Sequence, residues 1–163
     1  MKNYFKMFAM LAIASIFALS SCEKKSDDAK STKDYLTAGN WKVTAMTVSP
    51  GIEVMGITIT DIYQYLIEPC TKDDLIKFNV DGTVTDDEGA IKCDPDDPQT
   101  SDDGTWTLTN DDKTITILYP GEDPAPATIV SINGSTLVVS APLDMDFGLG
   151  TTAYTATITM TLQ

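Results

Sequence analysis

The stretch TAYTATITMTL, residues 152–162, alternates apolar and polar side chains over its whole length. Tyr154, Ala156, Ile158, Met160 and Leu162 occupy every second position, with Ala153 and four threonines among the positions between them. A period of two sends successive side chains to opposite faces of a β-strand, so this stretch predicts a strand with one face on a core. Because the sequence ends within this strand, we expect it to return to the first strand and close the sheet.

The same alternation recurs upstream between turn signals. Asp81-Gly82, Asn110-Asp111-Asp112 and Asn133-Gly134 are typical of the turns that join antiparallel strands. Seven further strands are predicted before the last one, at residues 41–45, 76–80, 83–85, 104–109, 114–119, 128–132 and 136–140. No βαβ pattern is present, so the chain is predicted to be all-β with about eight antiparallel strands.

Residues 57–69, between the first two predicted strands, break the alternation. Asp61 can cap a short helix with Gln64 three residues later, and Pro69 would end it. Ile62 and Leu66 are four residues apart and would share one face of that helix. The segment is interpreted either as a plug or lid on a barrel mouth, or as a gate for a ligand.

The first 22 residues have the parts of a secretory signal. Lys2 and Lys6 precede an apolar run from Phe8 to Leu19, which is too short to span ~30 Å of hydrocarbon comfortably. Leu19-Ser20-Ser21-Cys22 resembles the bacterial lipobox, in which the cysteine is acylated and becomes the new N-terminus. That resemblance implies a signal peptide at residues 1–21 and a membrane anchor on Cys22. A signal peptide cut elsewhere is the alternative.

Residues 22–35 are polar and are predicted to form a flexible tether, with the folded domain at residues 36–163. Ser26-Asp27-Asp28 resembles the acidic tags that export some lipoproteins to the cell surface. We therefore expect an outer membrane lipoprotein that is either displayed on the cell surface or faces the periplasm. In such an oxidising compartment Cys70 and Cys93 are expected to form a disulfide.

The composition excludes several functions. The formal net charge is −13, so binding to nucleic acid or to anionic lipid surfaces by charge is disfavoured. The chain has no histidine and no arginine, which removes the commonest general base, the commonest transition-metal ligand and the bidentate clamp for phosphates. We expect no enzymatic activity and no cofactor.

Several motifs together resemble a known family. Gly39-Asn40-Trp41 on the first strand matches the Gly-x-Trp element of lipocalins. The later series Cys70 to Asp74, Phe78 to Thr83, Cys93 and Gly104-Thr-Trp106 resembles the lipocalin-like domains of bacterial lipoproteins. The resemblance covers residues 36–163 and implies an eight-stranded antiparallel up-and-down barrel with Trp41 across its closed end. The family's late arginine, which packs over the tryptophan, has no counterpart here.

The first functional hypothesis is an anchored barrel that binds a small hydrophobic or amphipathic ligand. The candidate inward-facing residues are Trp41, Val43, Phe78, Trp106, Ile115 and Tyr154. They could equally fill the barrel, because small eight-stranded barrels can be packed solid. The alternative is a surface interaction protein with a solid core, which would contact proteins or glycans through the acidic segment from Asp86 to Asp103.

The acidic segment also raises the question of a metal. Its carboxylates are the hard oxygen ligands that calcium prefers, and the candidates are Asp86, Asp87, Glu88, Asp94, Asp96, Asp97, Asp102 and Asp103. The spacing fails the EF-hand template, because Pro98 stands where Asp or Asn is needed. A solvated loop is therefore the preferred interpretation, and calcium is the weaker one.

Overall fold

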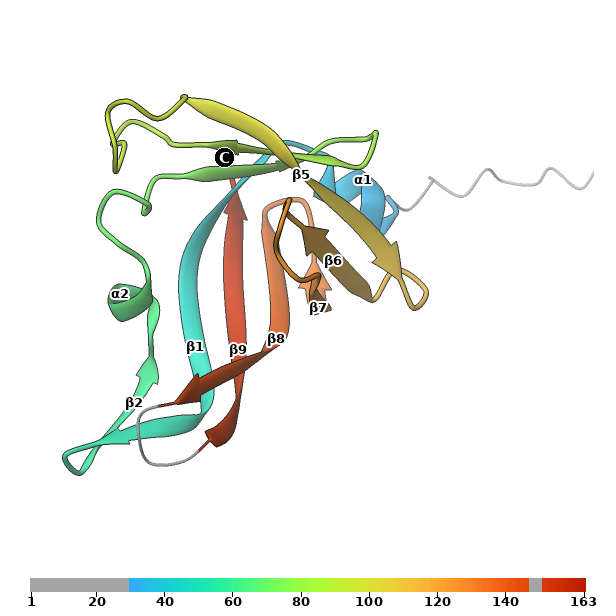
Figure 1. Ribbon diagram of the computed structural model, residues 1–163. Coiled ribbons are helices and arrows are strands. Elements are labelled where there is room, and N and C mark those ends of the chain that lie inside the picture. The colour runs from blue at the N-terminus through green and yellow to red at the C-terminus, as the bar shows by residue number, and fades with distance from the viewer. Residues whose placement is uncertain (1–29, 147–150) are drawn as a thin grey trace, which may run out of the picture.

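The structure, a computed structural model, describes residues 30–146 and 151–163 (Figure 1). Cys22, the predicted signal peptide and most of the predicted tether lie outside these residues. The elements in chain order are α1 (Thr32–Leu36), β1 (Asn40–Val54), β2 (Ile57–Asp61), α2 (Tyr63–Leu66), β3 (Leu75–Phe78), β4 (Thr83–Asp87), β5 (Thr100–Thr109), β6 (Thr114–Leu118), β7 (Ala125–Ile132), β8 (Thr136–Asp146) and β9 (Thr151–Leu162).

The described strands form one antiparallel sheet, and eight of them close into a barrel. From β3 to β9 each strand pairs with the next, β3 pairs with β1, and β9 pairs back onto β1 over Trp41 to Ser49. The predicted all-β barrel and the return of the last strand to the first are therefore confirmed. The predicted turns at Asp81-Gly82, Asn110 to Asp112 and Asn133-Gly134 join β3 to β4, β5 to β6 and β7 to β8.

The strand β2 is additional to the barrel and was not predicted. It pairs with the far end of β1, and the two are joined by Met55 and Gly56 at φ angles of 51° and 80°. Two successive positive φ values are the geometry of a tight hairpin turn. Assigning residues 57–61 to an irregular, helix-forming segment was therefore wrong.

The short helix between the first two barrel strands is confirmed as α2, but its predicted details are not. Its N-cap is Ile62 rather than Asp61, because Asp61 is still paired with Thr47 of β1. The Asp61 carboxylate instead accepts a hydrogen bond from the Tyr63 backbone N–H at 3.0 Å. Ile62 is buried whereas Leu66 is 42% exposed, so the two do not share a buried face.

One end of the barrel is closed by α1, all but the last residue of which lies within the predicted tether. Ser31 and Asp34 form a capping box, in which the Ser31 hydroxyl accepts from the Asp34 N–H and the Asp34 carboxylate accepts from the Ser31 N–H. The last residue of α1, Leu36, is fully buried in the main core. The folded part therefore begins several residues before the predicted boundary at residue 36.

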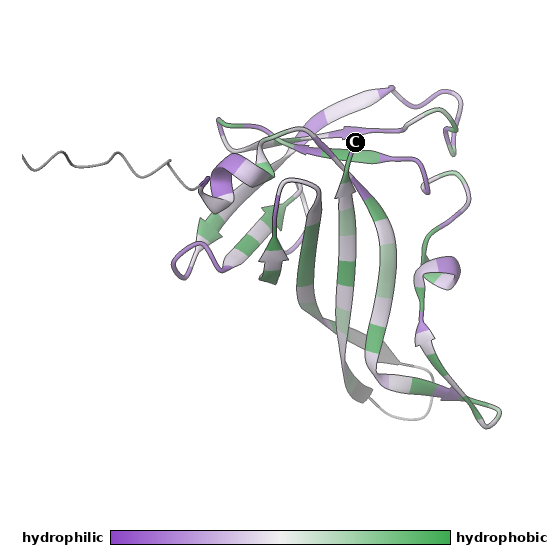
Figure 2. Ribbon diagram, turned by 180° about the vertical axis from the view of Figure 1, so that it is seen from behind, coloured by the Kyte–Doolittle hydropathy of each residue, from purple (hydrophilic) through white to green (hydrophobic). Residues whose placement is uncertain are grey.

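The buried side chains form two clusters. The main one fills the closed end and includes Trp41, Phe78, Val84 and Leu137. The second lies further along β1 and joins Val48, Ile52 and Ile62. Apolar and polar bands alternate along the long strands of the barrel (Figure 2), so every second side chain faces the interior and contributes to the core.

Candidate functional site

An apolar cavity of about 210 Å³ lies inside the barrel, beside the main core. Its walls come from β1, β3, β6, β7, β8 and β9, and every lining side chain is apolar. An apolar cavity of about 150 Å³ in another protein stays dry and binds benzene, so this volume suits a ring or a short acyl chain. The barrel interior is therefore the candidate site.

Three of the six predicted residues line this cavity. They are Val43 of β1, Phe78 of β3 and Ile115 of β6. Phe78 and Ile115 are almost completely buried, so they form rigid parts of the wall.

Trp41 and Trp106 lie at the closed end instead, in the main core. Their indole N–H groups donate to backbone carbonyls, from Trp41 to Leu36 at 2.8 Å and from Trp106 to Asn79 at 2.9 Å. A buried indole N–H without a partner is costly, so these bonds fix both rings in place. The Trp106 ring also meets Phe78 edge to face, with centroids 5.6 Å apart.

A lysine covers Trp106 at this end of the barrel. The Lys33 ammonium of α1 lies 5.9 Å from the centroid of the Trp106 ring, within range of a cation–π interaction. This chain thus places a cation over a closed-end tryptophan without any arginine.

Tyr154 lies away from the cavity. It packs against the second cluster, near Ile62, toward the far end of β1. The structure therefore does not bring Tyr154 together with Val43, Phe78 and Ile115.

The prediction missed most of the cavity wall. The missed residues are Ile76, Ile117, Ala125, Pro126, Ala127, Leu137, Val139, Ala141, Ile158 and Met160. The signal that would have found many of them is the period of two, since Leu137, Val139 and Ala141 follow one face of β8, as Ile158 and Met160 do on β9. The prediction named at most two inward residues on any strand and none on β7 or β8, so most of the wall was left out.

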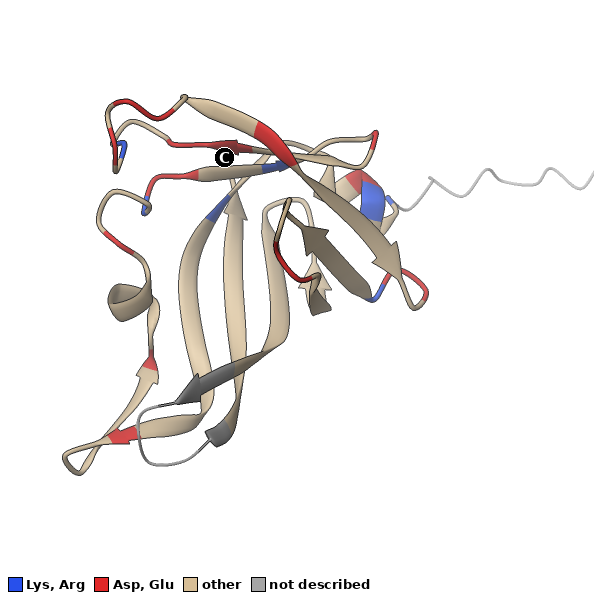
Figure 3. Ribbon diagram, viewed as in Figure 1, with Lys and Arg blue, Asp and Glu red and all other residues tan. Residues whose placement is uncertain are grey.

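Acidic residues gather on β4 and β5 and in the loops before β3 and between β4 and β5 (Figure 3). Burial and then the carboxylate of Glu88, with smaller contributions from Asp73, Asp86 and Asp87, raise the pKa of Asp74 to about 6. Burial also raises the pKa of Asp86, although Tyr119 donates a hydrogen bond to it at 3.1 Å. These carboxylates repel one another at one side of the barrel.

The acidic loop, residues 88–99, is held to the segment before β3 by covalent and polar contacts. The predicted disulfide between Cys70 and Cys93 is confirmed, with Cα atoms 5.1 Å apart. The Asp73 carboxylate accepts hydrogen bonds from the backbone N–H groups of Ala90 and Ile91, at 2.6 and 3.1 Å.

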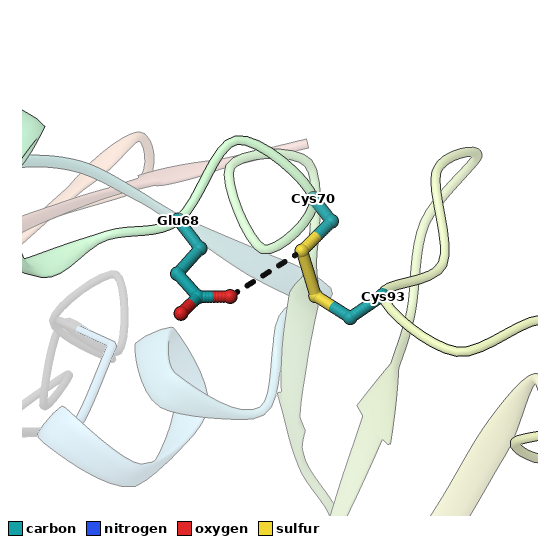
Figure 4. A group of neighbouring side chains, drawn as sticks. All are labelled: Glu68, Cys70 and Cys93. Carbon is teal, nitrogen blue, oxygen red and sulfur yellow. Dashed lines mark hydrogen bonds between the residues drawn. A yellow bond between two sulfur atoms is a disulfide. The ribbon is translucent and has the colours of Figure 1, made fainter.

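Within the described residues, one group of three possible metal-ligating side chains comes together: Glu68, Cys70 and Cys93 (Figure 4). Both sulfurs are bonded to each other, so neither is a thiolate available to a metal. The Glu68 carboxylate lies 3.8 Å from the Cys70 sulfur. The calcium candidates Asp94, Asp96, Asp97, Asp102 and Asp103 do not form such a group, so the geometry gives the calcium interpretation no support.

A closed up-and-down barrel, capped by a helix and tryptophans at one end and containing an apolar cavity, defines a lipocalin-like protein. The family model described as "Lipocalin-like domain" matches residues 37–139. Since this is more than half of the sequence, the chain belongs to the lipocalin-like domain family. No match to a curated protein was found. Among the described residues, no helix is long and apolar enough to cross a membrane.

Proposed function

We propose that this protein is a membrane-anchored, non-enzymatic binding protein whose barrel holds a small hydrophobic or amphipathic ligand. The observation that carries the proposal is the apolar cavity beside Phe78, because a solid core would leave no such volume. Most of the wall comes from paired strands, so its shape is preorganised.

Tryptophan fluorescence tests this proposal directly. The chain has two tryptophans, and both are buried at the closed end, where Phe78 separates the Trp106 ring from the cavity. A brominated alkane in the cavity would bring a heavy-atom quencher close to them, whereas one dissolved in lipid or detergent would not reach them. We expect saturable quenching by bromo-octane.

A matched pair of variants controls the experiment. Ala141→Phe places a ring in the cavity, whereas Ala153→Phe places the same ring at an exposed position on β9. Quenching should be lost in the first variant and kept in the second. Equal quenching in both, or none in the wild type, would count against a ligand in the barrel.

The anchor is supported by the sequence around Cys22. Acyl chains contribute about 0.8 kcal/mol of membrane affinity per buried CH₂, so several chains would hold the protein permanently at a membrane. Cells fed an alkyne-tagged fatty acid should label the wild type and Cys93→Ser but not Cys22→Ser. Persistent labelling of Cys22→Ser would contradict the proposal, and fractionation of the labelled protein would then test its expected outer membrane location.

The second candidate function is protein or glycan binding through the acidic loop. The observation in its favour is that the disulfide and the Asp73 hydrogen bonds fix an exposed, acidic segment to the barrel. Shortening the loop between Glu88 and Gln99 should then abolish capture of a partner without changing quenching by bromo-octane.

A further inference from the structure

The barrel wall is incomplete between β1 and β3. The two strands pair at only two positions, Asn40 with Lys77 and Trp41 with Ile76. The same edge of β1 next pairs at Thr47, which meets Asp61 of β2. From residue 42 to residue 46 this edge therefore has no strand beside it.

The segment around α2 covers this gap with two hydrogen bonds. The Tyr63 hydroxyl donates to the Val43 carbonyl at 3.2 Å, and the Ile62 backbone N–H donates to the Met46 carbonyl at 2.9 Å. Only one of these is a backbone–backbone bond, so the barrel wall here consists largely of side chains.

A second cavity, of about 240 Å³, lies at the gap, and we call it the outer compartment. Val43 and Ile76, one from each of the separating strands, line both this compartment and the cavity inside the barrel. The two volumes are therefore divided by two aliphatic side chains rather than by a hydrogen-bonded sheet.

The two volumes differ in polarity. The inner cavity is lined only by apolar side chains, whereas the outer compartment combines apolar residues, such as Ile67 and Leu75, with four carboxylates. Those acids are Asp74, Asp86, Asp87 and Glu88. Among the described residues none of them forms an ion pair with a lysine. One oxygen of Asp74 has no solvent access and no hydrogen-bond partner.

We propose that the outer compartment is the second half of the ligand site, and that the ligand is an amphiphile with an uncharged or cationic head. Its apolar part would occupy the inner cavity, and its head would pass between Val43 and Ile76 to lie against the carboxylates. This inference rests on the proposed function. The inner cavity alone is smaller than the ~300–1,000 Å³ of typical ligand pockets, whereas the two volumes together fall within that range. An anionic head, such as that of a fatty acid, would meet uncompensated like charge.

The test uses full-length protein in lipid nanodiscs and three quenchers with the same chain: ω-bromo-octanol, ω-bromo-octylamine and ω-bromo-octanoate. At pH 8 we expect the alcohol and the amine to quench the tryptophans at concentrations about tenfold lower than the carboxylate, since several carboxylates act together on the head. Asp74→Asn should narrow the difference. Asp123→Asn, which removes the same charge at an exposed position that lines neither compartment, should not.

The outer compartment itself is tested by filling it. Ile67→Phe should weaken quenching by the alcohol and the amine, while quenching by bromo-octane, which has no polar head, should stay unchanged. Leu66→Phe, on the exposed side of α2, should leave quenching by all of these compounds unchanged. Equal affinity for all three heads, or indifference to Ile67→Phe, would overturn the inference while quenching by bromo-octane still supported the proposed function. Failure of bromo-octane to quench would refute both.

Discussion

Removing the disulfide should lower the stability of the barrel by a predictable amount. Cys70 and Cys93 are separated by 23 positions in the sequence, and the bond ties the segment before β3 to the acidic loop. On the chain-entropy model, opening a loop of this length raises the conformational entropy of the unfolded chain, which lowers the free energy of unfolding by about 3 kcal/mol. The free energy of unfolding of a native domain is about 5–15 kcal/mol, so this change is a large fraction of the total stability.

The assay is urea unfolding of the Cys70→Ser/Cys93→Ser variant, followed by the fluorescence of the two buried tryptophans. With a denaturant slope of about 1–3 kcal/mol per molar urea, the midpoint should fall by about 1–3 M. The hydrogen bonds from Ala90 and Ile91 to Asp73 remain in this variant, so the folded acidic loop should keep its position.

Cys22→Ser is the matched control, because it removes a sulfur outside the disulfide. Its midpoint should equal that of the wild type. The reasoning would be refuted if the double variant unfolded at the wild-type midpoint, or if Cys22→Ser shifted it equally.

Three further predictions concern stability. Gly104→Ala should cost about 1–3 kcal/mol in thermal unfolding, because the new Cβ would lie 2.8 Å from a ring carbon of Tyr119 and 2.9 Å from Val84 Cβ, which is overpacking. Lowering the pH from 7.5 to 5 should raise the urea midpoint: the pKa of Asp74 is raised to about 6 in the folded state, so folding takes up a proton as the pH falls through this window. Screening at this partly exposed group leaves about 1 kcal/mol of that effect, and Asp74→Asn should reduce the rise. Ser31→Ala should destabilise the protein by about 1 kcal/mol through loss of the cap on α1, and an unchanged melting temperature would show that this cap adds nothing to stability.

The order of the barrel strands was predictable because its turns carry strong local signals. At Asp81-Gly82, for example, the Asp81 carboxylate accepts a hydrogen bond from the Thr83 N–H, and Gly82 adopts a φ of 93°. The hairpin between β1 and β2 lacked such a signal, because Met55 occupies a positive φ that methionine rarely adopts. Local sequence therefore predicts a turn when its residues favour the turn geometry, and misses it when pairing of the flanking strands imposes that geometry.

The helix α1 was missed for a different reason. Its capping motif, Ser31 with Asp34, is visible in the sequence, but it lies in a run of polar residues that has the composition of a tether. What orders these residues is tertiary. Leu36 is buried in the core and accepts the Trp41 indole hydrogen bond, and Lys33 lies over Trp106.

Whether the barrel is hollow depends on side-chain size, which the alternation does not encode. Period two specifies which side chains point inward, and it does so equally for Trp41 at the closed end and for Ala141 beside the cavity. At the closed end the inward residues are large, Trp41, Phe78 and Leu137, and they meet across the barrel. Further along, the wall includes Ala127 and Ala141, whose methyl groups are too short to reach the opposite strands. A cavity of this kind is thus predicted by small residues at inward positions on neighbouring strands, and this pattern becomes recognisable only once the strand register is known.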